Sequence, residues 1–282
     1  MQNSDRDYAV LMSVYAGEQP DWFRDALRSM FSQTLPPAQF VLVCDGPLTS
    51  ALEGVIAEAA AALGDALCLV RLAKNGGLGP ALNVGLTHCA FETVARMDTD
   101  DIALPGRCET QLALMRAQSL DLVSAAVEEF DPETGAATGV RRLPETHGAL
   151  LRYARKRNPM NHPAVMFRKS AVARAGGYRP MPYFEDYDLW VRMLQSGARL
   201  GNCPKVLLRM RAGASLYNRR GGLAYCRAVR NFYRAMRDEG FLSPAACFFH
   251  ALARCVISLA PGFARRGLYQ RALRDTAFGK TE

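Results

Sequence analysis

The stretch Arg96-Met97-Asp98-Thr99-Asp100-Asp101 places three carboxylates directly after an apolar run, Phe91 to Met97. The run predicts a buried strand, and open α/β sheets bind ligands beyond the carboxyl ends of such strands. Crowded carboxylates repel one another, and a divalent cation relieves that repulsion. Because Asp98 and Asp100 supply hard oxygen ligands, the pattern predicts a Mg²⁺ or Mn²⁺ site. The alternative is a solvated turn in which Asp101 caps the next helix.

Upstream of these carboxylates, apolar runs alternate with amphipathic segments. The expected strands cover residues 8–15, 40–44, 66–72 and 91–97, and the expected helices cover residues 21–33, 52–63 and 80–89. This alternation predicts a parallel sheet with right-handed crossovers. The loops after the strands then share one edge of the sheet. A nucleotide-type site is therefore expected there, formed by Tyr15, Asp45, the glycine loop of residues 74–79 and the aspartates.

The glycine loop, Lys74-Asn75-Gly76-Gly77-Leu78-Gly79, has two readings. Three glycines within four residues, just before a helix, let backbone amides approach a phosphate. Pro80 is expected as the first residue of that helix. The spacing matches neither a P-loop nor a dinucleotide-binding fingerprint, so an ordinary flexible turn is an equal alternative.

A second acidic cluster opens a helix later in the chain. The expected elements before and after it are a helix over 107–118, strands over 120–130 and 164–168, a helix capped by Ser170, and a strand over 205–208. The cluster lies in Phe184-Glu185-Asp186-Tyr187-Asp188-Leu189-Trp190, which begins a helix to about Gln195. Acidic residues in a first turn normally complement the helix dipole. Three acidic residues, flanked by aromatic residues, are more than the helix dipole requires, and they indicate a functional site.

Three other residues are weaker candidates. His162, held between Asn161 and Pro163, either contacts a diphosphate or acceptor or only pins its loop. Arg209 and Arg211 alternate onto one face after the strand over 205–208. They either bind a diphosphate or form a solvated strand end.

Composition limits the class of protein. The 282 residues are 49% hydrophobic, enough for one large domain and an appendage. Eight cysteines form no CxxC pair, which indicates small core residues in a reducing compartment instead of a zinc site or disulfide framework. Gln2 to Asp7 is polar, without the basic and apolar segments of a signal peptide, so a cytoplasmic protein is expected.

The net charge of +8 is concentrated at the C-terminus. Residues 215–282 contain 12 Arg and Lys against 4 Asp and Glu, and residues 1–214 are neutral. The basic positions of this tail include Arg227, Arg230, Arg234, Arg237, Arg265, Arg266, Arg271 and Arg274. Such a tail is expected to meet an anionic surface. The aromatic residues are not interleaved with this stripe and no nucleic-acid module is visible, so nucleic acid is not the expected partner.

An apolar helix is expected from Ala245 to about Leu259. Its narrow polar face carries His250, Arg254 and Ser258, opposite Phe248, Phe249, Leu252, Val256 and Leu259. A span needs about 20 apolar residues, so this helix is too short and too polar to cross a bilayer. It is similar to helices that lie in a membrane interface. The alternative is that it packs on the catalytic domain and leaves only the arginines exposed.

Taken together, these pieces resemble the bacterial family-2 glycosyltransferases, inverting enzymes of the GT-A fold. The resemblance is strongest to the small, amylovoran-type enzymes that build exopolysaccharide, capsule or O-antigen repeat units. The matching motifs follow family order over roughly residues 8–220: Val14-Tyr15, Asp45-Gly46, Asn75-x-Gly77, Asn83-x-Gly85, Asp98-Thr99-Asp100-Asp101, Asn161-His162-Pro163, Gly176-Gly177-Tyr178 and Glu185 to Trp190. Ala16, Cys44 and Pro47 depart from the usual residues beside the base and ribose contacts.

The resemblance implies a GT-A domain over residues 1–220, with a Rossmann-like, mostly parallel sheet flanked by helices. Its nucleotide-sugar half covers about 1–105 and its acceptor half about 106–220, followed by a basic amphipathic tail over 221–282. The implied nucleotide-sugar contacts are Val14, Tyr15, Glu18, Asp45, Gly79, Asn83, Asp98, Thr99 and Asp100. Among these, Tyr15 and Asp45 would hold the base and Glu18 the ribose side; Asp98 would bind ribose or the metal, and Asp100 the metal.

In the acceptor half, the resemblance implies Asp186 as the catalytic base with Glu185 beside it. Trp190 joins His162, Arg209 and Arg211 as weaker candidates for contact with the acceptor or diphosphate. The implied reaction moves a sugar from a nucleotide donor, expected to be UDP-linked, to a lipid-linked saccharide, with Mn²⁺ or Mg²⁺. The protein is then expected to be peripheral on the inner face of the cell membrane.

Two rival functions remain at this point. A sugar-nucleotide pyrophosphorylase would carry a glycine-rich, basic signature after the first strand, where this chain has Tyr15-Ala16-Gly17-Glu18. A membrane-bound scaffold with a decayed site would not need Asp98, Asp100 and Asp186, which are intact.

Overall fold

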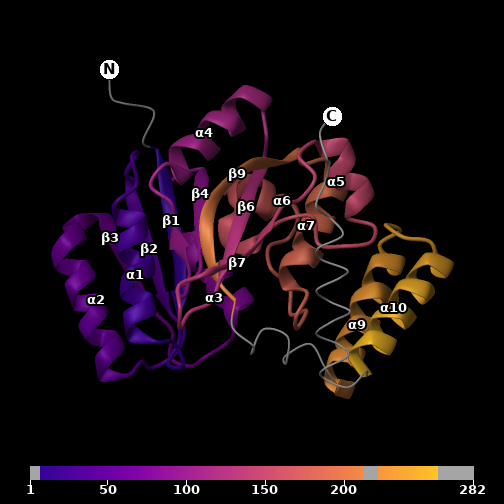
Figure 1. Cartoon of the computed structure of the whole chain (residues 1–282), viewed down its shortest axis with the longest axis horizontal. Coiled ribbons are helices and arrows are strands. Elements are labelled where there is room, and N and C mark those ends of the chain that lie inside the picture. Colours follow the sequence, from indigo (N-terminus) through magenta and orange to yellow (C-terminus); the bar gives the residue numbers. More distant parts are fainter. Residues whose placement is uncertain (1–6, 213–221, 260–282) are drawn as a thin grey trace.

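The N-terminal half forms the parallel part of one sheet. In the computed structural model, which describes residues 7–212 and 222–259, it consists of β1 (Tyr8–Val14), α1 (Pro20–Phe31), β2 (Gln39–Cys44), α2 (Ser50–Leu63), β3 (Leu67–Arg71), α3 (Leu78–His88) and β4 (Thr93–Met97). Strand β1 lies between β2 and β4 and is parallel to both, and β2 is parallel to β3. Figure 1 shows this half in indigo and violet. The predicted alternation of strands and helices is confirmed.

Helix α3 begins earlier than predicted. Its first residue is Leu78, so Pro80 is the third helical residue and the prediction of Pro80 at the first position is wrong. Gly77 at φ +90° occupies the cap and turns the chain into the helix. Proline is tolerated in this turn because the first amides of a helix have no carbonyl partner within it.

The second half completes the sheet with antiparallel and parallel pairs. Its elements are β5 (Ile102–Ala103), α4 (Arg107–Gln118), β6 (Leu122–Phe130), β7 (Ala137–Arg141), α5 (His147–Tyr153), β8 (Met166–Arg168), α6 (Lys169–Arg174), α7 (Glu185–Gln195) and β9 (Leu200–Arg211). The strand order is β3-β2-β1-β4-β8-β6-β9-β5, with β7 paired to β6. Strand β8 is antiparallel to both β4 and β6, whereas β9 is parallel to β6. Ser170 is inside α6 and Arg168 is the cap residue, so the predicted Ser170 cap is wrong.

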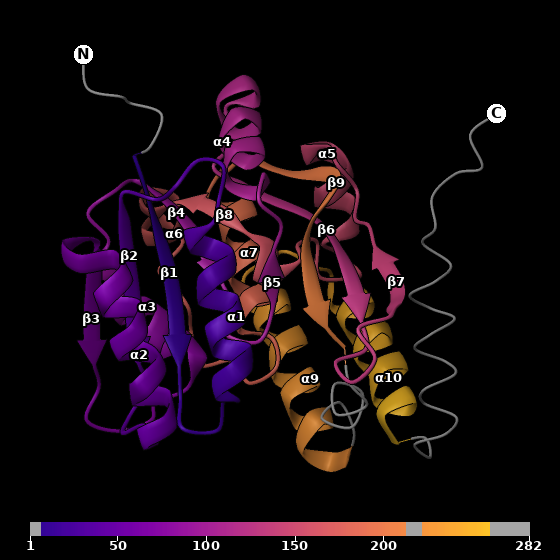
Figure 2. The same ribbon diagram turned by 60° about the vertical axis from the view of Figure 1, so that its left-hand side comes forward.

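Helices cover both faces of the sheet (Figure 2). Alternate residues of β1 point to opposite faces, because successive side chains of a strand alternate. Val10 and Met12 join the core beneath α1, α2 and α4, and Ala9 and Leu11 join the core beneath α3, α6 and α7. A strand buried on both faces reads as a continuous apolar run, which explains the YAVLMSV sequence of β1. The predicted α/β class, a mostly parallel sheet flanked by helices, is confirmed.

The helices α9 (Gly222–Asp238) and α10 (Pro244–Leu259) pack against one another at the end of the molecule opposite β3 (Figure 1). An aromatic cluster joins α9 to α7, with Phe184 stacked on Phe232 at 4.6 Å between ring centroids. Helix α10 turns its polar face inward: His250 stacks on Tyr233, and the Arg254 Nε donates to the Tyr233 hydroxyl at 2.9 Å.

The opposite face of α10 is exposed and apolar. Its exposed side chains are Phe248, Phe249, Leu252, Val256 and Leu259. The alternative in which packing leaves only arginines exposed is therefore wrong, because the helix packs through its polar stripe. Within residues 7–212 and 222–259, no helix is long and apolar enough to cross a bilayer. The predicted basic positions Arg265, Arg266, Arg271 and Arg274 lie outside the described residues.

Candidate functional site

Tyr15 and Asp45 emerge side by side from neighbouring strands. Val14 pairs with Cys44 in the parallel register, and the Asp45 amide donates to the Val14 carbonyl at 2.8 Å. The Tyr15 side chain is 45% exposed and its ring lies over Gly17. The Glu18 amide donates to the Tyr15 carbonyl at 3.2 Å, which closes the turn. The edge of the sheet thus presents an accessible aromatic ring beside a carboxylate.

The glycine loop is held by Asp45. The buried Asp45 carboxylate accepts hydrogen bonds from the Gly76 amide at 2.7 Å and the Gly77 amide at 2.9 Å. These two amides therefore bind a side chain of the protein instead of facing an open phosphate position. Of the two readings of this loop, the structure favours a turn, and a tightly held one.

Gly46→Ala is expected to destabilise the fold by about 1–3 kcal/mol. Gly46 has φ +87°, and a Cβ at this position would lie 2.6 Å from the Asn75 backbone nitrogen. A side chain therefore adds backbone strain and a clash that no rotamer relieves. Urea unfolding measures the loss. Gly54→Ala in α2 is the matched control: its Cβ meets nothing within 4 Å, and alanine there is expected to stabilise by about 0.5–1 kcal/mol. Equal stability changes in the two variants would contradict the prediction.

The three aspartates after β4 converge. One oxygen each from Asp98, Asp100 and Asp101 lies within 4.8 Å of the others. Asp101 is buried and accepts from the Arg211 amide at 2.9 Å; burial, then Asp100 and Asp98, raise its pKa well above the usual range. Helix α4 begins at Arg107 with Gly106 as its cap, so the alternative of Asp101 as a helix cap is wrong. Crowded oxygens of this kind fit the hard-ligand preference of Mg²⁺ or Mn²⁺.

Arg96 is a site residue that sequence reasoning missed. It is 1% exposed, and both terminal nitrogens bind the Asp98 carboxylate, with Nη1–Oδ2 at 2.6 Å. Its charge also lowers the pKa of Asp186 and of Glu185 against the larger effect of burial. Arg96 thus acts on both acidic clusters. The available signal was an arginine inside an otherwise apolar strand, since a buried arginine is rare unless it is paired.

Asp186 lies in the first turn of α7 and faces a cavity. Its Oδ2 accepts from the Asn158 side-chain amide at 2.6 Å. Burial raises the pKa of Asp186, and the Asn158 hydrogen bond lowers it by a smaller amount. Burial also raises the pKa of Glu185, whose buried Oε2 has no hydrogen-bond partner among residues 7–212 and 222–259. A carboxylate with a raised pKa at a cavity wall suits general-base chemistry near neutral pH.

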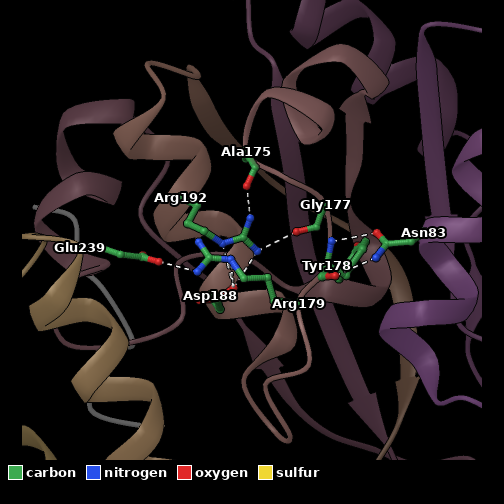
Figure 3. A network of polar contacts seen from close by, with 8 residues as sticks. All are labelled: Asn83, Ala175, Gly177, Tyr178, Arg179, Asp188, Arg192 and Glu239. Atoms are coloured by element: carbon green, nitrogen blue, oxygen red, sulfur yellow. Dashed lines mark hydrogen bonds and ion pairs between the residues drawn. The ribbon is translucent and has the colours of Figure 1, made fainter.

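Asp188, the third acidic residue of α7, has a structural role. It is buried and forms an ion pair with Arg192 at 2.7 Å. Arg192 also donates to the Gly177 carbonyl at 2.7 Å, and Arg179 connects Asp188 to Glu239 after α9 (Figure 3). In the same network, the Asn83 side-chain amide forms two hydrogen bonds with the backbone of Tyr178. Its Nδ2 donates to the Tyr178 carbonyl at 2.7 Å, and its Oδ1 accepts from the Tyr178 amide at 2.9 Å. The network ties α3, α7 and α9 together and sets the position of Asp186.

His162 packs against Tyr178 and Trp190. Its Nε2 lies 3.0 Å from the Tyr178 hydroxyl, and its ring contacts Trp190. Burial and then the charge of Arg96 lower the pKa of His162, so the imidazole is neutral at physiological pH. Burial raises the pKa of Tyr178, the charge of Arg96 lowers it by a smaller amount, and Asp186, Asp98 and Glu185 raise it slightly further. Trp190 is fully buried beneath this group, in the core.

Arg209 and Arg211 lie on one face, as predicted, with both guanidinium groups over the Phe130 ring. Arg209 binds Glu128 at 2.7 Å. Arg211 binds the Asp100 carbonyl at 2.7 Å through Nε. Arg211 therefore holds in place the acidic turn of residues 98–101. Gly79 lies under Tyr178, whose Cβ would be 3.4 Å from a side chain at that position.

A cavity of about 550 Å³ opens beside Asp186 between α5, α7, α9 and α10. His162 and Asn158 also line it, and Asp98 and Asp100 lie outside its lining. His162 thus lines the cavity together with Asp186, whereas Arg96 and Tyr178 do not.

The chain matches the sequence model of the glycosyl transferase family 2 over residues 9–175. It is 40% identical over 268 residues to the amylovoran biosynthesis glycosyltransferase AmsE of Erwinia amylovora, covering 94% of this chain and 98% of that protein. It is 33% identical over 279 residues to the UDP-Gal:alpha-D-GlcNAc-diphosphoundecaprenol beta-1,3-galactosyltransferase of Escherichia coli, covering 97% and 99%.

Solved structures of glycosyltransferases share the fold. Residues 1–349 of S. aureus TarS in complex with UDP-GlcNAc superpose with a TM-score of 0.64 at 17% identity, covering 87% of this chain and 70% of that one. The mannosyltransferase PcManGT from Pyrobaculum calidifontis, in complex with GDP-Man and Mn²⁺, superposes with a TM-score of 0.63 at 17% identity, covering 98% and 76%.

Proposed function

This chain belongs to glycosyl transferase family 2 and is a glycosyltransferase, and on that premise we propose that it transfers a sugar from a UDP-linked donor to a saccharide carried on a lipid diphosphate. The product belongs to the synthesis of a surface polysaccharide. The names of the Erwinia and E. coli relatives, which align over nearly their full lengths, support this assignment. The observation that carries it is Asp186, a carboxylate with a raised pKa at the wall of a ligand-sized cavity.

The donor binds along the edge formed by the ends of β1, β2 and β4. Tyr15 and Asp45 hold the base between them, with Val14 beneath and Glu18 on the ribose side. Asp45 also orders the glycine loop through the Gly76 and Gly77 amides. Gly79 and Asn83 act through Tyr178, which they contact and hold.

Asp98 and Asp100 hold the divalent cation, Mn²⁺ or Mg²⁺, with Thr99 buried between them. When bound, the cation supplies a Lewis acid that stabilises negative charge on the leaving diphosphate. Arg211 keeps the acidic turn in place through its bonds to Asp100 and Asp101. Arg96 balances the charge of Asp98.

Asp186 removes the proton from the acceptor hydroxyl as that hydroxyl attacks the anomeric carbon. Attack from the face opposite the leaving group inverts the configuration of that carbon. Asn158 orients the carboxylate through its hydrogen bond to Oδ2. Glu185 lies next to Asp186; burial raises the pKa of Glu185, and the charge of Asp186 raises it further.

The proposed reaction is tested by incubating the protein with Mn²⁺, a panel of UDP-sugars and a GlcNAc-diphosphate-lipid. We expect a glycosylated lipid whose new linkage is inverted relative to the donor, read by NMR of the anomeric proton. Family membership removes the pyrophosphorylase rival. Absence of both metal-dependent donor hydrolysis and transfer to any acceptor would favour the inactive-scaffold rival.

We further propose that the protein binds the anionic inner face of the cell membrane through α9 and α10. The apolar face of α10 is exposed, and Leu223, Phe248 and Leu252 line a groove with Arg227 and Arg230. Apolar side chains bordered by arginines match the interface of an anionic bilayer. A lipid-linked acceptor requires the enzyme to work at that surface.

Leu252→Glu is expected to weaken binding to anionic liposomes about tenfold or more, because it replaces an inserted apolar side chain with a charge that the surface repels. Flotation of the full-length protein with vesicles containing phosphatidylserine measures the change. Ala51→Glu, at an exposed position of α2, is the matched control and should float like the unmodified protein. Equal flotation of all three proteins would end the membrane proposal.

A further inference from the structure

The cavity beside Asp186 is lined by cations far in excess of acids. Its lining contains five arginines and lysines, Arg141, Arg142, Lys156, Arg157 and Arg254, and Asp186 is its one carboxylate among the described residues. Like charges gathered in one enclosed space repel one another. This arrangement is therefore suited to a ligand with more than one negative charge.

Arg254 is held at the cavity wall by neutral groups. It enters the cavity from α10, where Nε donates to the Tyr233 hydroxyl at 2.9 Å and Nη2 to the Lys156 carbonyl at 3.3 Å. Its guanidinium group also lies over the Phe184 ring, at 5.8 Å from the centroid. In the described part of the chain, no carboxylate forms a salt bridge with Arg254. A half-buried guanidinium group held only by neutral partners retains its capacity to bind an anion.

The ligand must also have an uncharged part next to its anionic part. Tyr153, Tyr187 and Tyr225 line the same cavity, so sugar-like or apolar surface has matching walls. Ala253 and Ile257 of α10 line the cavity as well, whereas their chain neighbours Leu252 and Val256 are exposed on the outer face. Helix α10 is thus the wall between the cavity and the apolar surface proposed to lie on the membrane.

We infer that this cavity binds the diphosphate of the lipid-linked acceptor, with Arg254 as its principal contact. Arg142 and Lys156, both exposed, lie where the anion enters. The lipid chain leaves along α10 toward the bilayer, and the saccharide points toward Asp186. The inference rests on the proposed function and adds to it a role for the C-terminal helices: they complete the acceptor site and do not serve only as an anchor.

The donor diphosphate is the other polyanion of the reaction. It belongs with the cation-binding aspartates, which lie outside the lining of this cavity. The donor diphosphate and the acceptor diphosphate are therefore expected to bind without competing. A competition experiment can thus tell which of the two binds in this cavity.

The direct test is calorimetric titration of the full-length protein with decyl diphosphate, without donor. We expect Arg254→Gln to weaken binding about 10- to 100-fold, the effect of losing charged hydrogen bonds. Arg254→Lys should restore part of the affinity, and Lys156→Gln should weaken it less. Arg155→Gln is the matched control, because Arg155 is an exposed neighbour outside the cavity lining. Saturating UDP with Mn²⁺ should leave the affinity for decyl diphosphate unchanged.

The kinetic test compares decyl-diphosphate-GlcNAc with a decyl GlcNAc glycoside that lacks phosphate. Arg254→Gln should raise the KM for the first acceptor about 10- to 100-fold and leave the KM for the second and for the donor unchanged. Lys156→Gln allows the same comparison between the two acceptors, and it leaves the hydrogen bond between Arg254 and Tyr233 in place. Equal effects on both acceptors, competition by UDP, or binding insensitive to both substitutions would overturn the inference. Variant-sensitive binding without sugar transfer would instead overturn the proposed function and leave the cavity assignment standing.

Discussion

Asp186→Asn is expected to lower the rate of sugar transfer about 10²- to 10⁴-fold, the contribution of a general base. Asparagine has nearly the same shape but cannot take a proton from the acceptor hydroxyl. The proposed donor contacts are other residues, at the ends of β1, β2 and β4, so metal-dependent binding of UDP should be largely unchanged. Transfer of radiolabelled sugar and a thermal shift with UDP and Mn²⁺ measure the two quantities.

Asp188→Asn is the control for this variant. Asp188 is two residues away on the same helix but is buried against Arg192, so its loss should lower the melting temperature more than the catalytic activity of the folded fraction. If Asp186→Asn retained turnover, Asp186 would be excluded as the base.

The pH dependence of the reaction tests the same carboxylate. Burial raises the pKa of Asp186 above its usual value, and a base must be deprotonated to act. Activity should therefore fall, as the pH is lowered, at a higher pH than an ordinary aspartate would give. Asn158→Ala removes a hydrogen bond that lowers this pKa, so the acid limb of the kcat profile should move to higher pH.

Asp100→Asn is the second large effect, with an expected loss of about 10²-fold or more in transfer, since a catalytic cation contributes several kcal/mol. The substitution removes a negatively charged oxygen ligand from a cluster whose other members are held by Arg96 and Arg211. Calorimetric titration with Mn²⁺ in the presence of UDP should show weakened metal binding. This readout does not depend on catalysis.

Asp131→Asn is a suitable control for the metal prediction. Asp131 caps a turn after β6 by accepting from the Glu133 and Thr134 amides, outside the acidic cluster. It should leave Mn²⁺ binding unchanged. Unaltered Mn²⁺ affinity in Asp100→Asn would remove Asp100 from the set of metal ligands.

Much of the donor edge could be predicted because its signals are local. Strands β1, β2 and β4 are apolar runs, and residues that follow parallel strands must lie at one edge of the sheet. Tyr15, Asp45 and Asp98 therefore follow the ends of neighbouring strands, as the alternation of elements indicates. The partner of Asp45 could not be predicted, because the Gly76 and Gly77 amides reach it only when a loop more than thirty residues away folds back.

The acceptor side was less predictable for the same reason. The antiparallel insertion of β8 between β4 and β6 depends on pairing between segments far apart in the chain. Periodicity predicted both faces of α10 correctly but could not decide which one packs. The polar stripe turned inward because Tyr233 and the Lys156 carbonyl offer Arg254 hydrogen bonds there.

Sequence alone therefore determined the order of the elements, the family and the two acidic clusters, because hydrophobic periodicity and short motifs are carried by neighbouring residues. Tertiary structure decided which charges meet. It placed Arg96 against Asp98, Asp188 against Arg192, and five arginines and lysines around the cavity beside Asp186. Electrostatic energy depends on distance through space and on burial, and spacing along the chain specifies neither.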